Sequence, residues 1–249
     1  MEMDARPSPG AVALVTGAGG GIGARVAARI AEIGCRVVCA GRRIDRVEAV
    51  AASLNGRGLG LALDVTDKDS VASLSSRLPA GWQQVEILVN NAGHDSGGRR
   101  PFHEGSAEQW ADIIETNVVG LVRVTRALIG GMRERNRGHI VNIGSIAGTR
   151  PYATGTLYSA SKHAVHGFSE SLRLDYADTG IRVTEIMPGM VKTDFAFNRS
   201  GDAALAEQFY QDFGTSLDPD DVARGVVFAL QQPARVVISQ LVVVPISQR

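Results

Sequence analysis

Short apolar runs alternate along the chain with longer segments in which apolar positions recur at helical spacing. Residues 11–15 form the first such run, and residues 24–32 form the first helical segment. Continuous apolar runs are typical of strands buried on both faces, and helices between them are typical of crossovers between parallel strands. The pattern predicts an α/β fold, a doubly wound (Rossmann-type) parallel sheet of about seven strands with helices on both faces. The expected strands span 11–15, 35–40, 59–63, 85–89, 139–144, 181–187 and 236–244.

Two helix starts carry recognisable capping residues. Ser106 and Gln109 have capping-box spacing at the start of a long helical stretch toward Asn136. Asp218 followed by Pro219 is a second start, of a helix that ends near residue 231. The other expected helices span 24–32, 43–54, 68–78 and 157–178. We expect a disordered tail over 1–10 and a single domain over 11–249.

Composition narrows the class of protein. The chain has 249 residues, with 26 basic and 26 acidic side chains, so nothing in its charge points to nucleic acid or to an acidic membrane surface. No apolar run reaches the length of a membrane span, and the polar N-terminus is unlike a signal peptide. Cys35 and Cys39 would lie about 13 Å apart on a strand, too far for a disulfide. We therefore expect a protein of the reducing cytoplasm.

A glycine-rich turn joins the first strand to the first helix. It runs Thr16-Gly-Ala-Gly-Gly-Gly-Ile-Gly23. Glycines permit a tight turn and close approach of the backbone, and a helix N-terminus attracts a pyrophosphate. The alternative is a turn that merely joins strand to helix. On the first interpretation the cofactor-binding residues are Gly17, Gly19, Gly21, Ile22 and Gly23.

The end of the second strand bears on the choice of cofactor. An acidic residue there would bind the ribose 2′-hydroxyl of NAD, but this chain has Gly41-Arg42-Arg43. Guanidinium groups suit a 2′-phosphate, so NADP(H) is favoured and NAD(H) stays possible. Arg42 is the better candidate for the phosphate, and Arg43 for stacking on adenine. The alternative is that both arginines are solvated at the start of the next helix.

Ser145, Tyr158 and Lys162 form the candidate catalytic group. Ser145 ends an apolar run, and Tyr158 and Lys162 are four residues apart in a segment of helical spacing. A cation beside a phenol lowers the pKa of the phenol, and such a tyrosine can exchange a proton with a substrate oxygen. Taken alone, a Tyr-x-x-x-Lys pair is more often a surface contact.

The motifs Thr-Gly-x-x-x-Gly-Ile-Gly, Asn90-Asn-Ala-Gly93 and Ser145 with Tyr158-x-x-x-Lys162 together resemble the short-chain dehydrogenase/reductase family, over about residues 11–245. The resemblance implies that Tyr158 is the general acid or base and that Ser145 hydrogen-bonds the substrate oxygen. It also implies that Lys162 lowers the pKa of Tyr158 and holds the nicotinamide ribose. Asn117, whose ordinary explanation is a satisfied structural hydrogen bond, would complete a proton relay through a water.

The same resemblance implies further cofactor contacts. Asp64 and Val65 would touch adenine, although Asp64 also suits a helix cap. The turn at Pro188 and Gly189 would pass under the nicotinamide. Residues 194–214 would form a lid over the substrate, the alternative being ordinary core packing. The remaining implied contacts are Asn91, Ala92 and Gly93 at the cofactor crevice and Val191 and Thr193 at the carboxamide.

Within the family, Gly-Arg-Arg, Pro151-Tyr-Ala-Thr-Gly and Pro219-Asp-Asp-Val-Ala look similar to the NADP-dependent 3-hydroxy acid (serine-type) dehydrogenases. A small anionic hydroxy or oxo compound is thus the expected substrate, with Arg150, Lys192 or Arg199 as candidate anion contacts. A carbonyl reductase for apolar ketones and a non-catalytic NADP-binding sensor are the alternatives.

Three other expectations concern partners, metals and a loop. The resemblance implies a homo-oligomer, a tetramer or else a dimer, through the helices near 107–135 and 157–178. We expect no metal site, since the five histidines lack a supported ligand spacing. Arg99, Arg100 and His103 lie in a polar loop, where we expect solvated side chains and assign no role.

Overall fold

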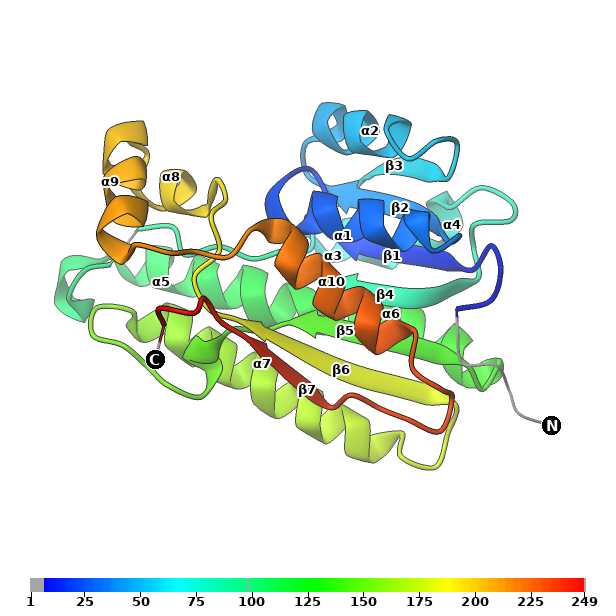
Figure 1. Cartoon of the computed structure of the whole chain (residues 1–249). Helices are drawn as coiled ribbons and strands as arrows, with labels where there is room; N and C mark the ends of the chain where they lie inside the picture. The colour runs from blue at the N-terminus through cyan, green and yellow to red at the C-terminus, as the bar shows by residue number, and fades with distance from the viewer. Residues whose placement is uncertain (1–6, 98, 249) are drawn as a thin grey trace.

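The computed structural model describes residues 7–97 and 99–248, except the side chains of 198–200, and its centre is a parallel sheet (Figure 1). Seven strands pair in the order β3-β2-β1-β4-β5-β6-β7, all parallel. This confirms the predicted doubly wound α/β fold. The strands are β1 Val12–Thr16, β2 Arg36–Gly41, β3 Gly58–Ala62, β4 Val85–Asn90, β5 Gly138–Ile143, β6 Ile181–Pro188 and β7 Gln240–Val243.

Helices cover both faces of the sheet (Figure 1). The α-helices are α1 Gly21–Glu32, α2 Ile44–Ala52, α3 Lys68–Ala72, α4 Leu74–Arg77, α5 Ala107–Ile114, α6 Leu121–Glu134, α7 Thr156–Asp175, α8 Phe195–Ser200, α9 Ala203–Phe213 and α10 Pro219–Leu230. A π-helix, η2 Glu115–Gly120, joins α5 to α6, and 3-10 turns lie at η1 Phe102–Glu104 and η3 Ile146–Gly148. The capping box expected at Ser106 and the N-cap expected at Asp218 are both present, and Asp218 also forms a capping box with Asp221.

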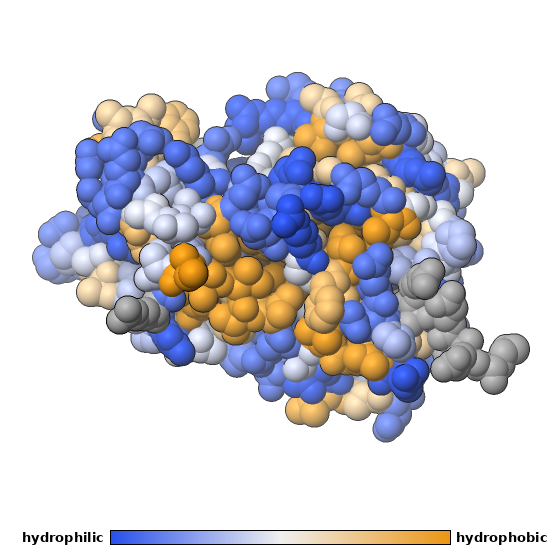
Figure 2. All heavy atoms as spheres, viewed as in Figure 1, coloured by the Kyte–Doolittle hydropathy of each residue, from blue (hydrophilic) through white to orange (hydrophobic). Residues whose placement is uncertain are grey.

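The edge of the sheet at β7 is open on the face shown in Figure 2, where hydrophobic residues gather along this strand. Val242 is 57% exposed and Val244 is 39% exposed. Phe228, on the neighbouring helix α10, is 50% exposed. An apolar edge of this kind is unusual on a monomer surface and favours contact with another protein surface.

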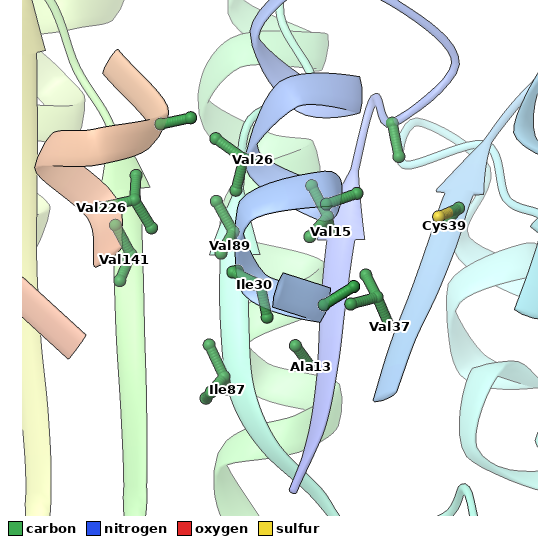
Figure 3. Packing of buried hydrophobic residues seen from close by; sticks show 14 of the residues in the cluster. Ala13, Val15, Val26, Ile30, Val37, Cys39, Ile87, Val89, Val141 and Val226 are labelled. Carbon is green, nitrogen blue, oxygen red and sulfur yellow. The ribbon is translucent and has the colours of Figure 1, made fainter. Parts of the chain in front are cut away.

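Successive residues of the central strands feed two separate cores. Val15 on β1 points toward α1, which carries Val26, and Val226 of α10 lies beside Val141 of β5 in the same core (Figure 3). Leu14 belongs instead to the core on the opposite face, together with Val124 of α6. Because both faces of β1 are buried, the strand shows a continuous apolar run rather than an alternating one.

Three expected elements differ in detail from the structure. The helix expected over 68–78 is split at Ser73, whose hydroxyl donates to the carbonyls of Asp69 and Ser70 and competes with the helix backbone. The stretch from Ser106 toward Asn136 is interrupted by η2. The last strand covers only 240–243 of the expected 236–244, the part that pairs with β6.

The N-terminal tail expected over 1–10 lies outside the described residues at 1–6, but its last residues are bound to the domain. The Ser8 amide donates to a carboxylate oxygen of Glu86 at 3.4 Å, and the Gly10 amide donates to the Gly34 carbonyl at 3.3 Å. The ordered chain therefore begins before residue 11.

A buried carboxylate joins the first helix to the last one. Asp220 on α10 accepts hydrogen bonds from Arg29 at 2.8 Å and from Arg25 at 2.8 Å, both on α1. Arg224, one turn further along α10, donates to the same carboxylate at 3.0 Å. The guanidinium groups, chiefly that of Arg29, hold the pKa of Asp220 well below its ordinary value.

We expect Asp220→Asn to lower the free energy of unfolding by about 1–2 kcal/mol at pH 7, because the arginine partners are partly exposed and solvent screens them. The depressed pKa means that this contribution is present above about pH 4, the ordinary aspartate pKa, and is lost as pH falls through the folded-state pKa. Urea unfolding at pH 7 and pH 3 measures both effects. Glu32→Gln, which removes only an exposed partner of Arg29, is the matched control; an equal loss in the two variants would contradict the assignment.

Candidate active site

A cleft of about 840 Å³ lies at the carboxyl ends of the strands. Ligands of open parallel sheets bind at this edge, where the strand order reverses, and here the reversal falls between β1 and β4. The cleft collects residues from nearly the whole chain. The predicted site residues that line it are Gly17, Gly19, Gly21, Ile22, Arg42, Arg43, Asp64, Val65, Asn91, Ala92, Gly93, Ser145, Tyr158, Lys162, Pro188, Gly189, Val191 and Thr193.

Two glycines of the first turn have different geometric reasons to be glycine. Gly17 has a φ of +65°, the left-handed region that favours glycine. Gly23 does not line the cleft, and a Cβ there would lie 2.4 Å from the Gly17 carbonyl oxygen. Gly23 therefore lets helix α1 pack directly beneath the turn, and the turn keeps its backbone open to a phosphate group.

Thr16 and Asn91 tie the ends of β1 and β4 together. The Thr16 hydroxyl accepts the backbone N–H groups of Asn91 and Ala92, each at 3.0 Å. The Asn91 side chain returns two bonds, donating to the carbonyls of Thr16 at 3.0 Å and Gly17 at 3.2 Å. These four bonds fix the glycine turn against the Asn-Ala-Gly segment. Sequence analysis assigned no role to Thr16, although it directly precedes the first glycine of the motif.

The two arginines that follow strand β2 lie at one end of the cleft. Arg42 and Arg43 are exposed and line it, and Arg43 is the N-cap residue of α2. Asp64 accepts both the amide and the hydroxyl of Thr66, at 2.9 and 2.7 Å. The cap of α3 is Asp67. The alternative of Asp64 as that cap is therefore wrong, and Asp64 remains at the cleft wall.

Tyr158 and Lys162 face the cleft from α7. The Lys162 ammonium is 5.7 Å from the centre of the Tyr158 ring and donates to the Ile143 carbonyl at 2.9 Å. Burial lowers the pKa of Lys162 to about 8, and the charge of Glu185 partly opposes that shift. The ammonium is therefore still protonated at neutral pH, where its positive charge favours the phenolate form of Tyr158.

Ser145 directly follows β5 on the same side of the cleft. Its hydroxyl accepts the Ala147 amide at 3.1 Å and lies 3.5 Å from the Pro188 carbonyl. The preceding Gly144 has no room for a side chain, because a Cβ would lie 2.1 Å from a carboxylate oxygen of Glu185. The strand end and the nicotinamide turn expected at Pro188 are thus held close together.

Asn117 lies in the π-helix η2, and its side chain does not line the cleft. Its amide oxygen accepts the His94 N–H at 2.9 Å, and its amide nitrogen donates to the His94 carbonyl and to the Ser161 hydroxyl, each at 3.0 Å. These are the structural hydrogen bonds that sequence analysis gave as the ordinary explanation. π-helices are often found at functional sites, and the proposed water relay stays a prediction.

Residues 194–214 fold into α8 and α9 beside the cleft. The ring of Phe195 meets the ring of Tyr158 edge to face, with centres 5.7 Å apart. The Tyr210 hydroxyl lies 3.2 and 2.9 Å from the carbonyl oxygens of Val191 and Thr193 and accepts the Thr193 amide at 3.2 Å. The segment therefore contacts the candidate catalytic tyrosine and the turn after β6.

The three candidate anion contacts differ in their position relative to the cleft. Arg150 is exposed and lines the cleft. Lys192 lies outside the lining and pairs with Glu207 at 3.4 Å, which favours a surface side chain over an anion contact. The side chain of Arg199 lies outside the described residues. Arg99, which we expected to be solvated and without a role, lines the cleft beside two aromatic rings.

The described residues also bear on two other kinds of site. In 7–97 and 99–248, no group of three or more His, Cys, Asp and Glu side chains is placed to hold a metal ion. Within the same ranges, no helix combines the length and apolar character that crossing a membrane requires.

Comparison with known proteins gives concordant matches. Residues 11–203 match the family model for short chain dehydrogenase. The NADP-dependent 3-hydroxy acid dehydrogenase YdfG of Salmonella typhi is 42% identical over 95% of this chain and 96% of that protein. The serine 3-dehydrogenase of Agrobacterium fabrum is 34% identical over 94% of each chain. The closed form of a serine dehydrogenase complexed with NADP+ superimposes with a TM-score of 0.92, at 42% identity over 96% of each chain.

We expect Thr16→Val to weaken NADPH binding about tenfold and to lower the free energy of unfolding by about 1–3 kcal/mol, because two backbone N–H groups lose their acceptor without a change in volume. Fluorescence titration and urea unfolding measure the two effects. Thr16→Ser keeps the hydroxyl and should bind NADPH like the wild type. Unchanged NADPH binding by the valine variant would contradict the role given to the Thr16 hydrogen bonds.

Proposed function

This chain belongs to the short-chain dehydrogenase family, and from that premise we propose that it is an NADP(H)-dependent oxidoreductase that interconverts an alcohol and a carbonyl. The observation that carries the proposal is the grouping of Ser145, Tyr158 and Lys162 in one cleft with the glycine turn. The NADP-dependent relatives support the choice of cofactor. When bound, the nicotinamide accepts or supplies the hydride.

The residues of the cleft fit such a cofactor. Gly17 and Gly21 leave the turn without side chains at the N-terminus of α1, where a pyrophosphate is favoured. Arg42 is exposed beside Gly41, and no carboxylate among the described residues pairs with it, so its donors suit a 2′-phosphate. Asp64 and Val65 form the wall next to this end of the cleft.

In the proposed mechanism, Tyr158 transfers the proton, and the other side chains stabilise its phenolate or bind the substrate oxygen. For carbonyl reduction the Tyr158 hydroxyl donates a proton to the substrate oxygen, and for alcohol oxidation the phenolate accepts it. Lys162 stabilises the phenolate by its charge, and Ser145 donates a hydrogen bond to the same substrate oxygen. Asn117 would position a water that returns the proton to solvent.

A small anionic hydroxy or oxo compound is the proposed substrate. The names of two relatives, a 3-hydroxy acid dehydrogenase and a serine 3-dehydrogenase, support this class. The positive charges of Arg99 and Arg150 at the cleft are consistent with it. The rings of Tyr152, Phe195 and Phe209 keep the alternative of an apolar ketone open. We propose that residues 194–214 act as the substrate lid.

We propose that the chain assembles as a homo-oligomer, a tetramer or else a dimer. Support comes from exposed apolar side chains on two faces, Val122 and Leu174 on the long helices and Phe228 and Val242 at the β7 edge (Figure 2). We also propose a cytoplasmic location, which the buried free thiols of Cys35 and Cys39 support.

We expect Tyr158→Phe to lower kcat about a thousandfold or more, because the proton donor is removed, while the dissociation constant of NADPH changes less than about threefold. Absorbance-monitored turnover and fluorescence titration measure these values. Tyr176→Phe, a tyrosine outside the cleft, is the control. Unchanged turnover of the Tyr158 variant would show that the proton-transfer assignment is wrong. Lack of turnover by the wild type on both acids and ketones would make NADPH binding the next measurement for the sensor alternative.

We expect Arg42→Ala to raise the KM for NADPH about ten- to a hundredfold and to leave the KM for NADH nearly unchanged, because only NADPH carries the 2′-phosphate. Steady-state kinetics with each cofactor measure the change in preference. The exposed Arg126 of α6 provides the matched control in Arg126→Ala. Equal losses with both cofactors would mean that Arg42 does not contact this phosphate.

A further inference from the structure

Arg99 contacts side chains from two other segments of the cleft. It lies on the connection from β4 to α5, and its guanidinium carbon is 4.6 Å from the centre of the Tyr152 ring and 5.3 Å from that of Phe209. Tyr152 belongs to the loop between Ser145 and Tyr158, and Phe209 belongs to α9. The side chain is therefore placed by the catalytic loop and by the proposed lid together.

Within the described part of the chain, the guanidinium of Arg99 contacts two aromatic rings. Among the described residues, no carboxylate forms an ion pair with it. The carboxylates that line the cleft are each engaged elsewhere: Asp64 with Thr66 at 2.7 Å, Asp112 with His94 at 3.2 Å and Asp194 with Arg46 at 3.9 Å. The strong donors of Arg99 thus remain available to a ligand.

Two aromatic rings suit a guanidinium that must bind an anion. Rings attract the faces of a guanidinium and restrict its rotation, while its N–H groups project from the edge. A carboxylate binds that edge through two parallel hydrogen bonds. Arg150 also lines the cleft, but among the described residues no ring holds its guanidinium.

We propose that Arg99 binds the carboxylate of the substrate and so determines the preference for an acid over a neutral alcohol or ketone. This inference rests on the proposed function, since it assigns the anion contact of the same site. Tyr152 and Phe209 position the guanidinium. Because Phe209 belongs to α9, an acid bound by Arg99 would lie close to the proposed lid, residues 194–214.

The first test compares 3-hydroxypropanoate with its neutral methyl ester, using NADP+. Arg99→Met should lower kcat/KM for the acid about ten- to a hundredfold, mainly through KM, and change kcat/KM for the ester less than about threefold. The kcat/KM of Arg99→Lys for the acid should lie between the values of the wild type and Arg99→Met. Arg100→Met, on the adjacent residue that does not line the cleft, is the matched control. Equal losses on acid and ester would overturn the proposal, as would a selective loss in Arg150→Met but not in Arg99→Met.

The second test measures binding without turnover, so that the two proposals fail separately. Propanoate is titrated by calorimetry into the complex of the protein with NADP+. The inference predicts binding by the wild type and by Arg100→Met, and a loss of at least tenfold in affinity in Arg99→Met. If the wild type oxidises no 3-hydroxy acid yet binds propanoate through Arg99, the proposed reaction fails and the anion site stands. If Arg99→Met binds propanoate and oxidises the acid as well as the wild type does, or if the wild type neither binds propanoate nor oxidises the acid, the anion site is overturned.

Discussion

The cleft depends on the reversal of strand order between β1 and β4. The connections that leave these two adjacent strands run to opposite faces of the sheet, so a crevice opens between them. Such a crevice is useful only if its rim is rigid, and the bonds between Thr16 and Asn91 supply that rigidity. The glycine turn, the Asn-Ala-Gly segment and the N-terminus of α1 then have fixed relative positions, which a large dinucleotide requires.

Burial of the Lys162 ammonium is unfavourable for the stability of the fold. Removing an ammonium from water is unfavourable, and the lowering of its pKa to about 8 records that cost. The Ile143 carbonyl is its only hydrogen-bond partner that the described structure shows, at 2.9 Å. A hydrophobic side chain would be easier to accommodate at this position. We infer that the cation is retained because the chemistry at Tyr158 requires a charge that water does not screen.

Local pattern was sufficient for the sheet, and motif spacing was sufficient for most of the cleft. The strands carry continuous apolar runs that predict the sheet. Ser145 directly follows β5, and Tyr158 and Lys162 lie one turn apart on α7, so the topology places all three at the cleft. Arg99 is exposed as expected, but nothing in the sequence indicated its contacts with the rings at 152 and 209, because these residues are distant along the chain. The pairing of Lys192 with Glu207 likewise depends on how the segment folds. The break at Ser73 and the π-helix around Asn117 depend on side-chain hydrogen bonds that hydrophobic periodicity does not register.

The Tyr210 side chain ties segment 194–214 to main-chain atoms of the turn after β6. Tyr210 bonds the backbone of Val191 and Thr193 rather than their side chains. Backbone acceptors are present whatever the sequence of that turn. Substitutions of the Val191 and Thr193 side chains therefore leave these acceptors in place. As the proposed lid, this segment would be a natural starting point for directed evolution toward new substrates.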